Sequence, residues 1–382
     1  MDVRLNEEQM MIRQTVRDLA RSRIAPRAAE IDRTGEFPWD VVDLFRQHDL
    51  FALPFPPEHG GLSGSALTLN VAIEELAKVC ATSALILAVQ ALGAYPVMIA
   101  GTDEQKQRLL PDLAAGKKLA AYALSEPGAG SDPAGMVTRA ERHGDEYVIT
   151  GSKIWITDGG VADTITVFAK TDPAARSKGV SAFVLEDAQQ LKGFQASTIH
   201  GKLGIRGSNT AELQLDEVVV PAANLLGEEG DGFRIAMRVL DRSRPGVAAQ
   251  ALGIAHGALD YAGGYARERK QFGKSIGEFQ GIQFMLADME AQTAAARAMV
   301  YWASQLIDDH SPEVTHHAAI AKLLAGDAAM KVTTDAVQIL GGYGYVNEYP
   351  VERMMRDAKI TQIYEGTNQI QRVVIARDLL RA

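Results

Sequence analysis

One carboxylate near the end of the chain has neighbours that are unusual for a charged residue. In the stretch "IYEGTNQIQ", Glu365 follows Ile363 and Tyr364, precedes Gly366, and is succeeded by the uncharged Thr-Asn-Gln. A carboxylate withdrawn from water has a raised pKa and is a stronger base than one in water. The stretch therefore predicts either a general base that removes a weakly acidic proton or an exposed carboxylate at a helix cap.

A glycine-rich segment and a tryptophan-bearing strand are candidates for ligand contact. In "YALSEPGAGSDP" (122–133), small residues allow the backbone to approach a ligand, and Ser125 and Ser131 offer hydroxyls. A turn that links two domains explains the same composition. The segment lacks the third glycine of a Rossmann fingerprint, because proline occupies position 133. In "KIWITDGG" (153–160), Trp155 falls on an expected strand, where tryptophan is more often a core residue than a cofactor contact.

Charged pairs and clusters suggest two further sites. "LDRSRPGVAAQ" (240–250) places Asp241 and Arg244 one helical turn apart, as in an ordinary ion pair exposed to solvent. "RERKQFGKSIGEFQ" (267–280) gathers basic residues before a glycine. A solvated basic face or the recognition of a phosphate explains this cluster, since arginine can bind phosphate with two parallel hydrogen bonds.

Composition and motifs argue against several classes of protein. The formal charge of −9 over 382 residues disfavours nucleic-acid binding as the main task. The single cysteine, Cys80, excludes an internal disulfide framework, and the scattered histidines form no spaced metal-ligand set. The mixed charges of the first 20 residues predict neither a signal peptide nor a membrane span. The apolar run "ALILAVQALGAYPVMIAG" is interpreted as a core helix whose end is marked by Pro96.

The hydrophobic period divides the chain into three parts. Residues 1–119 show helical spacing, with Thr102 as an expected helix cap in "GTDEQKQ". Residues 120–227 show period two, as in "AELQLDEVVVP", and no long helical pattern interrupts them. The helical period returns over residues 228–382, where "QILGGYGY" (338–345) holds a glycine pair that ends a helix or lies against a ligand. The fold predicted is an α+β chain in which a small antiparallel barrel or sandwich separates two helical domains.

Taken together, these segments resemble the acyl-CoA dehydrogenase family. The resemblance rests on "YALSEPGAGSD", "KIWITDGG", "KLGIRGSNTAEL", "RERKQFGKSIGEFQ", "QILGGYGY" and "IYEGTNQIQR", which occur in the family's order over essentially the whole chain. It is strongest with the short-chain and bacterial members. It implies an N-terminal helical domain, a middle β domain, a C-terminal four-helix bundle, and FAD bound without a covalent link in a homotetramer.

The resemblance also implies roles for individual residues. FAD contacts fall on Tyr122, Leu124, Ser125, Trp155, Ile156, Thr157, Arg269, Phe272, Gln280, Gln338, Ile339, Leu340, Gly341, Gly342, Thr367, Asn368 and Gln369. Acyl-CoA contacts fall on Ser131, Asp241, Arg242, Ser243, Arg244 and Gly366. Among the FAD contacts, Arg269, Phe272 and Gln280 match positions that reach the cofactor across a subunit interface.

Glu365 matches the catalytic base of the family. The implied reaction removes the α proton of an acyl-CoA thioester and transfers the β hydride to flavin, which gives the trans-2-enoyl-CoA. Some members carry the base on the helix of the CoA-contacting segment, where this chain has Ser243, which cannot serve. Electron-transfer flavoprotein is the implied acceptor, and the implied location is cytoplasmic, or the mitochondrial matrix for a processed eukaryotic chain.

Three alternatives to this activity remain open to different degrees. Acyl-CoA oxidases share the fold but are usually much longer than 382 residues. Members that act on carrier-protein-bound or specialised biosynthetic thioesters carry the same motifs. A non-catalytic flavin-binding or acyl-CoA-binding protein is expected to lose Glu365 or the flavin contacts, and this chain keeps both. The length and branching of the acyl chain depend on residues that we expect around "ALILAVQALGAY" and 241–252.

Overall fold

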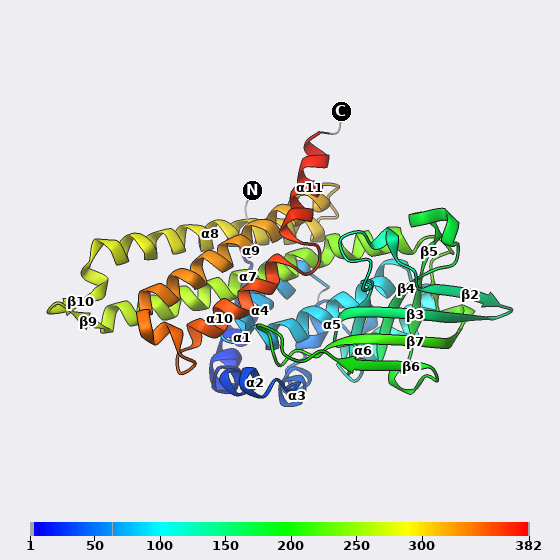
Figure 1. The fold of residues 1–382 in the computed structure, drawn as a ribbon, viewed down its shortest axis with the longest axis horizontal. Helices are drawn as coiled ribbons and strands as arrows, with labels where there is room; N and C mark the ends of the chain where they lie inside the picture. Colours follow the sequence, from blue (N-terminus) through cyan, green and yellow to red (C-terminus); the bar gives the residue numbers. More distant parts are fainter. Residues whose placement is uncertain (1–3, 63, 381–382) are drawn as a thin grey trace.

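The computed structural model describes residues 4–62 and 64–380, and their elements follow the predicted order of helices, strands and helices. Figure 1 shows an elongated molecule with the sheet at one end. A two-stranded hairpin, β9 (Lys270–Gln271) and β10 (Lys274–Ser275), lies at the opposite end, and long helices run between them. The arrangement confirms the predicted α+β class.

Six α-helices form the first part of the chain. They are α1 (Glu7–Leu19), α2 (Ala28–Thr34), α3 (Trp39–Gln47), α4 (Ala66–Ala77), α5 (Ala81–Ala100) and α6 (Asp103–Ala114). The predicted cap of α6 is confirmed, because the Thr102 side chain accepts a hydrogen bond from the Gln105 amide at 3.2 Å. The Gln105 side chain in turn accepts from the Thr102 amide at 2.8 Å. This reciprocal pair satisfies two of the amides that a helix start leaves free.

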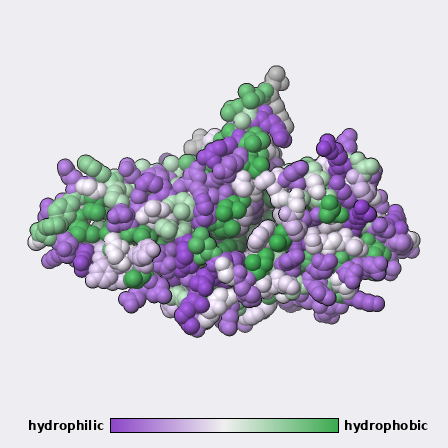
Figure 2. All heavy atoms as spheres, viewed as in Figure 1, coloured by the Kyte–Doolittle hydropathy of each residue, from purple (hydrophilic) through white to green (hydrophobic). Residues whose placement is uncertain are grey.

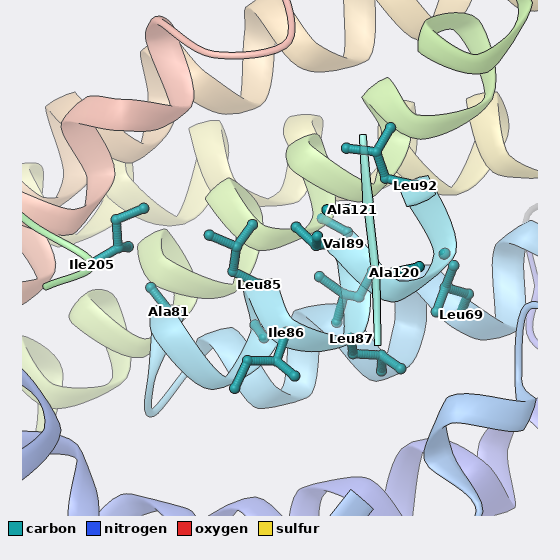
Figure 3. Close-up of a cluster of buried hydrophobic side chains, with 14 of the residues drawn as sticks. Leu69, Ala81, Leu85, Ile86, Leu87, Val89, Leu92, Ala120, Ala121 and Ile205 are labelled. Atoms are coloured by element: carbon teal, nitrogen blue, oxygen red, sulfur yellow. The ribbon is translucent and has the colours of Figure 1, made fainter. Parts of the chain in front are cut away.

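The apolar helix α5 forms the centre of the core, and its predicted end is wrong. Pro96 lies inside the helix, which continues to Ala100. Proline inside a helix removes one backbone hydrogen bond, and Pro96 is buried within the packed interior. A Cβ added at Gly93 would lie 2.6 Å from the Cβ of Ala120, so glycine lets α5 lie directly on the first strand. Figure 3 shows Val89 and Leu92 of α5 beside Ala120 and Ala121 of that strand.

By length and composition, α5 alone among the helices of the described residues could cross a membrane. However, 72% of its most apolar window is buried inside the protein. A helix that is apolar on all sides and covered by other elements is typical of a protein core.

The middle part of the chain is an eight-stranded sheet. Its strands are β1 (Ala120–Ala123), β2 (Arg139–His143), β3 (Glu146–Thr157), β4 (Thr164–Lys170), β5 (Val180–Leu185), β6 (Phe194–Thr198), β7 (Thr210–Pro221) and β8 (Leu225–Leu226). Their order is β6-β7-β3-β2-β4-β5-β8, with β1 beside β4. Most neighbours are antiparallel as predicted, but β1 and β2 each pair with β4 in parallel. In β7 the predicted alternation is confirmed, with Ala211, Leu213 and Leu215 fully buried.

Five helices form the last part. They are α7 (Gly232–Glu268), α8 (Gln280–Asp308), α9 (Val314–Leu340), α10 (Pro350–Ala358) and α11 (Asn368–Leu379). Helices α7, α8 and α9 pack on one another, and α10 packs on α7 and α9. In Figure 1, α11 projects away from this bundle. The face drawn in Figure 2 is hollowed between the helices and the sheet, below α11, with apolar side chains along the edge of the hollow.

Candidate active site

Glu365 lies in the turn that precedes α11, and its backbone is left-handed. Its φ is 51°, and Gly366 follows with a φ of 90°. The N-cap of α11 is Thr367, whose side chain accepts a hydrogen bond from the Ile370 amide at 3.3 Å. The interpretation of Glu365 as a helix-cap carboxylate is therefore wrong. Its carboxylate instead accepts a 2.5 Å hydrogen bond from the hydroxyl of Ser243 on α7.

The surroundings of Glu365 favour its neutral form. Burial raises the pKa of this carboxyl above its ordinary value, against the hydrogen bond from Ser243 and the charges of Arg244 and Lys322. A raised pKa gives a carboxylate greater proton affinity once it is ionised. The N–H of Glu365 makes no hydrogen bond with the described residues, so it is free to donate to a ligand.

A small apolar pocket opens beside this carboxylate. Its cavity volume is about 10 Å³, and it lies between α4, α5 and α7. Its lining residues are Leu69, Asn70, Ile73, Ala88, Ala91, Tyr95, Arg242, Ser243, Gly246 and Glu365. The guanidinium of Arg242 lies over the Tyr95 ring, 5.0 Å from its centroid. The Nε atoms of Arg242, in the lining, and of Arg244, outside it, are buried without a partner among the described residues.

The pair Asp241 and Arg244 is mostly shielded from solvent, which corrects the interpretation of an exposed ion pair. The Arg244 Nη1 atom donates to Asp241 Oδ1 at 2.9 Å, and the arginine side chain is 5% exposed. Thr315 on α9 also donates to Asp241 at 2.6 Å. The pair thus anchors α9 to the part of α7 that lines the pocket.

The structure places Trp155 in solvent, so the core interpretation of this residue is wrong. Its side chain is 62% exposed and its φ is 63°. The register of β3 against β7 shifts between Lys153 and Ile156. Such a β-bulge changes the direction of the side chains within it, here that of Trp155. The Ile154 amide donates to the Ser125 carbonyl at 3.0 Å, so this bulge lies beside the glycine-rich segment.

A buried ion pair joins the glycine-rich segment to β3. Lys153 Nζ donates to Glu126 Oε1 at 2.7 Å and to the Leu124 carbonyl at 3.3 Å. Glu126 also accepts from the amides of Val137 and Thr138. Burial alone would raise the pKa of Glu126, but the Lys153 charge and these hydrogen bonds hold it below its usual value. The pair fixes the candidate cofactor segments to each other.

Other predicted contacts lie away from Glu365. Ser131 lies on the exposed turn that links β1 to β2, outside the pocket lining. Arg269 and Phe272 flank β9, Gln280 begins α8 just after the hairpin, and Gln338–Gly342 lie at the end of α9. The Arg269 guanidinium lies 5.2 Å from the centroid of Tyr343, which directly follows Gly342. Phe272 is 93% exposed. One chain therefore does not bring this group to Glu365.

Several predicted cofactor contacts have buried side chains. Asn368 is 2% exposed and hydrogen-bonds with Lys322 and Asp327, while Ile339 and Leu340 are also buried. Only the backbone of these positions remains available to a ligand. Gln369 is exposed, and Thr367 is occupied in capping α11.

Sequence reasoning missed the contribution of α4 to the pocket. The expected segments supply Ala88, Ala91, Tyr95 and Gly246, whereas Leu69, Asn70 and Ile73 were not predicted. Helix α4 is buried along its whole length, so no amphipathic face marks the pocket side. Among the described residues, no group of three or more His, Cys, Asp or Glu side chains could hold a metal ion.

Comparison with known proteins identifies the chain. Three family domains match it: the acyl-CoA dehydrogenase N-terminal domain (residues 6–117), middle domain (121–218) and C-terminal domain (230–380). A short-chain-specific acyl-CoA dehydrogenase of Clostridium acetobutylicum is 50% identical over 382 residues, all of both chains. A cyclohexane-1-carbonyl-CoA dehydrogenase of Geobacter metallireducens is 50% identical over 378 residues, 98% of each chain.

Solved structures agree with these matches. Butyryl-CoA dehydrogenase from Megasphaera elsdenii superimposes with a TM-score of 0.97 at 46% identity, over 100% of both chains. A chain solved in work on the electron transferring flavoprotein of Acidaminococcus fermentans also gives 0.97, at 47% identity and full coverage of both chains. The matching family and the matching fold are those of a flavin-dependent oxidoreductase. The chain belongs to the acyl-CoA dehydrogenase family, whose cofactor is FAD.

The described residues fit a flavin. An isoalloxazine ring needs a planar apolar contact and hydrogen-bond partners, and Trp155 offers an exposed indole. The hydroxyls of Ser125 and Thr157 make no hydrogen bond among the described residues. A Cβ added at Gly128 or Gly130 would meet nothing within 4 Å, so the adjoining turn leaves open space.

Proposed function

We propose that the enzyme dehydrogenates short acyl-CoA thioesters to trans-2-enoyl-CoA, with Glu365 as the base that removes the α proton. The observation that carries this proposal is the position of the half-buried Glu365 carboxylate at the pocket wall, where the Ser243 hydroxyl holds it. Proton removal next to a thioester needs a base stronger than a carboxylate in water, and burial supplies that strength.

The pocket orients the substrate for this step. An acyl chain lying along Ile73, Ala91 and Gly246 directs its α carbon to Glu365, and the apolar walls exclude water. The free N–H of Glu365 donates to the thioester carbonyl and stabilises the negative charge that develops on its oxygen. Ser243 keeps the carboxylate oriented until substrate binds.

FAD, when bound, supplies the acceptor for the hydride that leaves the β carbon. Tyr122–Ser125 and Trp155–Thr157 are the segments of this chain that would hold it, with Thr367 and Gln369 nearby. By the family resemblance, the group around Arg269 and Gln338 would reach the FAD of another subunit, so we propose an oligomer, with a homotetramer as the expected form. Electron-transfer flavoprotein is the proposed acceptor, supported by the likeness to the chain from the Acidaminococcus work.

The small size of the pocket supports a short acyl chain. Leu69 and Ile73 from α4 are among the residues that line it. The relatives named for short-chain and butyryl substrates agree with this size. The 50% identity to a cyclohexane-1-carbonyl-CoA dehydrogenase makes a compact cyclic acyl group the second candidate.

The deciding experiment is anaerobic bleaching of the visible flavin band by a panel of thioesters. The panel contains butyryl-, isobutyryl-, isovaleryl-, cyclohexanecarbonyl-, octanoyl- and palmitoyl-CoA. We expect rapid bleaching by butyryl-CoA and none by palmitoyl-CoA. If an FAD-loaded preparation is bleached by no CoA ester, the proposal fails, and acyl groups on a carrier protein become the next panel.

A further inference from the structure

The turn that presents Glu365 has an uncommon backbone. Glu365 and Gly366 are consecutive residues with φ values of 51° and 90°. For a residue with a Cβ, the left-handed region is sterically unfavourable, because Cβ approaches the following carbonyl oxygen. Such a conformation persists only where the surrounding structure holds it.

Two buried side chains hydrogen-bond the carbonyls of this turn. Lys322 on α9 donates from Nζ to the Gly366 carbonyl at 2.8 Å and to Asn368 Oδ1 at 2.9 Å. Gln371 on α11 donates from Nε2 to the Gly366 carbonyl at 2.9 Å and to the Glu365 carbonyl at 3.3 Å. Both side chains are 0% exposed. The carbonyls of Glu365 and Gly366 therefore both accept hydrogen bonds from buried side chains.

The helix beneath the turn is also tightly fitted. A Cβ added at Gly326 on α9 would lie 3.1 Å from the Thr361 carbonyl and 3.3 Å from the Asn368 amide nitrogen. Asp327 accepts from Asn368 at 2.8 Å and from Gln362 at 2.7 Å. Helix α9 thus contacts the chain on both sides of Glu365.

Burying the Lys322 ammonium is energetically unfavourable, so packing alone does not explain a lysine at this position. No carboxylate among the described residues forms an ion pair with its ammonium. The charged groups that act on it are Glu365, Arg244 and Asp327, and burial lowers the pKa of Lys322 to about 7. A buried cation without an ion pair is costly, and an apolar side chain of the same length would avoid that cost.

We propose that Lys322 is a positioning residue for Glu365: its ammonium, together with Gln371, fixes the Glu365–Gly366 turn so that the carboxylate faces the pocket. The inference rests on Glu365 being the base. Lys322 is not among the residues that line the pocket, and its effect on the reaction passes through the turn and the base itself.

Backbone hydrogen exchange tests the fixing of the turn without any turnover. We expect Lys322→Met and Gln371→Met to speed exchange in peptides that cover residues 363–371 by about tenfold or more. The matched control is Lys331→Met, since Lys331 lies on the same helix with a 58% exposed side chain. Exchange in both variants equal to wild type would overturn the proposal. If Lys322→Met does not fold, Gln371→Met carries the same test.

Kinetics then separates positioning from loss of stability. A displaced base lowers kcat by roughly 10²-fold while KM changes little. The Lys322 charge lowers the pKa of Glu365, so Lys322→Met should also move the acid limb of the kcat profile to higher pH, and Gln371→Met should not. A Lys322→Met enzyme with faster exchange but unchanged kcat and pH profile would overturn the proposal. Failure of the wild-type enzyme to bleach with any acyl-CoA would instead overturn the proposed function, whatever the exchange result.

Discussion

The hydroxyl of Ser243 donates a 2.5 Å hydrogen bond to the carboxylate of Glu365, across 122 residues of sequence. Ser243 occupies the position that the sequence resemblance associates with an alternative base, and Glu365 occupies the usual one. Both side chains line the same pocket. A base at either position would therefore face the same bound substrate, and in this chain the serine serves as a donor to the glutamate.

Replacement of Glu365 by glutamine should abolish most dehydrogenation while leaving the protein folded. Glutamine keeps the shape of the side chain but cannot accept the α proton, and a general base contributes about 10²–10⁴-fold. FAD content and acyl-CoA binding, measured by absorbance and calorimetry, should remain. Glu313→Gln, an exposed site at the start of α9, is the control. Full activity in Glu365→Gln would remove Glu365 from the mechanism.

The same substitution should make the protein more stable at neutral and alkaline pH. Burial raises the folded-state pKa of Glu365 above its unfolded value of about 4.3. The favourable contribution of this carboxyl is complete below the unfolded pKa and is lost as pH rises through the folded pKa. Glutamine stays neutral throughout. The Tm of Glu365→Gln should exceed that of wild type near pH 8, and the excess should disappear near pH 4. A pH-independent difference would contradict the raised pKa.

Removal of the Ser243 hydroxyl should raise the pKa of Glu365 further, because that hydrogen bond favours the ionised form. The acid limb of the kcat/KM profile of Ser243→Ala should move to higher pH. A hydrogen bond to a charged group contributes about 1.5–3 kcal/mol, so the loss of rate at low pH should approach tenfold or more. Ser208→Ala is the matched control, since its buried hydroxyl has no partner among the described residues. Identical profiles for the two variants would show that the bond has no influence on the base.

A methyl group at Gly246 should narrow the substrate range. An added Cβ would lie 3.4 Å from Asn70 Oδ1 and 3.6 Å from Ile73 Cδ1, which is ordinary contact, so Gly246→Ala should fold. Within a helix, alanine adds up to about 1 kcal/mol of stability over glycine. KM for branched or cyclic acyl-CoA should rise several-fold more than KM for butyryl-CoA. Gly263→Ala on the same helix, away from the pocket, should show the gain in stability alone. An unchanged KM for every substrate would exclude Gly246 from the acyl site.

Breaking the Glu126–Lys153 pair should weaken both the fold and flavin binding. Removal of one partner from a buried ion pair leaves an uncompensated charge, which costs about 3–5 kcal/mol. Lys153→Met should therefore unfold earlier in denaturant and lose FAD on dilution. The double variant Glu126→Leu/Lys153→Met removes both charges and should recover part of the stability. If the double variant is as unstable as the sum of the single variants, the pair does not act as a unit.

Local patterns in the sequence were enough for the class of fold and for much of the site. The alternation in β7 and the cap at Thr102 depend on neighbours within a few residues, so they can be inferred without coordinates. The motif order identified the family and pointed to Glu365. Both inferences use information that is local in the chain or carried by resemblance.

Tertiary packing decided the features that depend on distant residues. Pro96 stays inside α5 and Trp155 is turned outward by a bulge, because packing and sheet register outweigh the preferences of single residues. The pocket combines α4, α5, α7 and the turn before α11, and no periodicity marks which side chains of a fully buried helix face a cavity. The sequence alone assigned no role to Lys322. Only the tertiary structure buries its ammonium and brings it within hydrogen-bond distance of the Gly366 carbonyl.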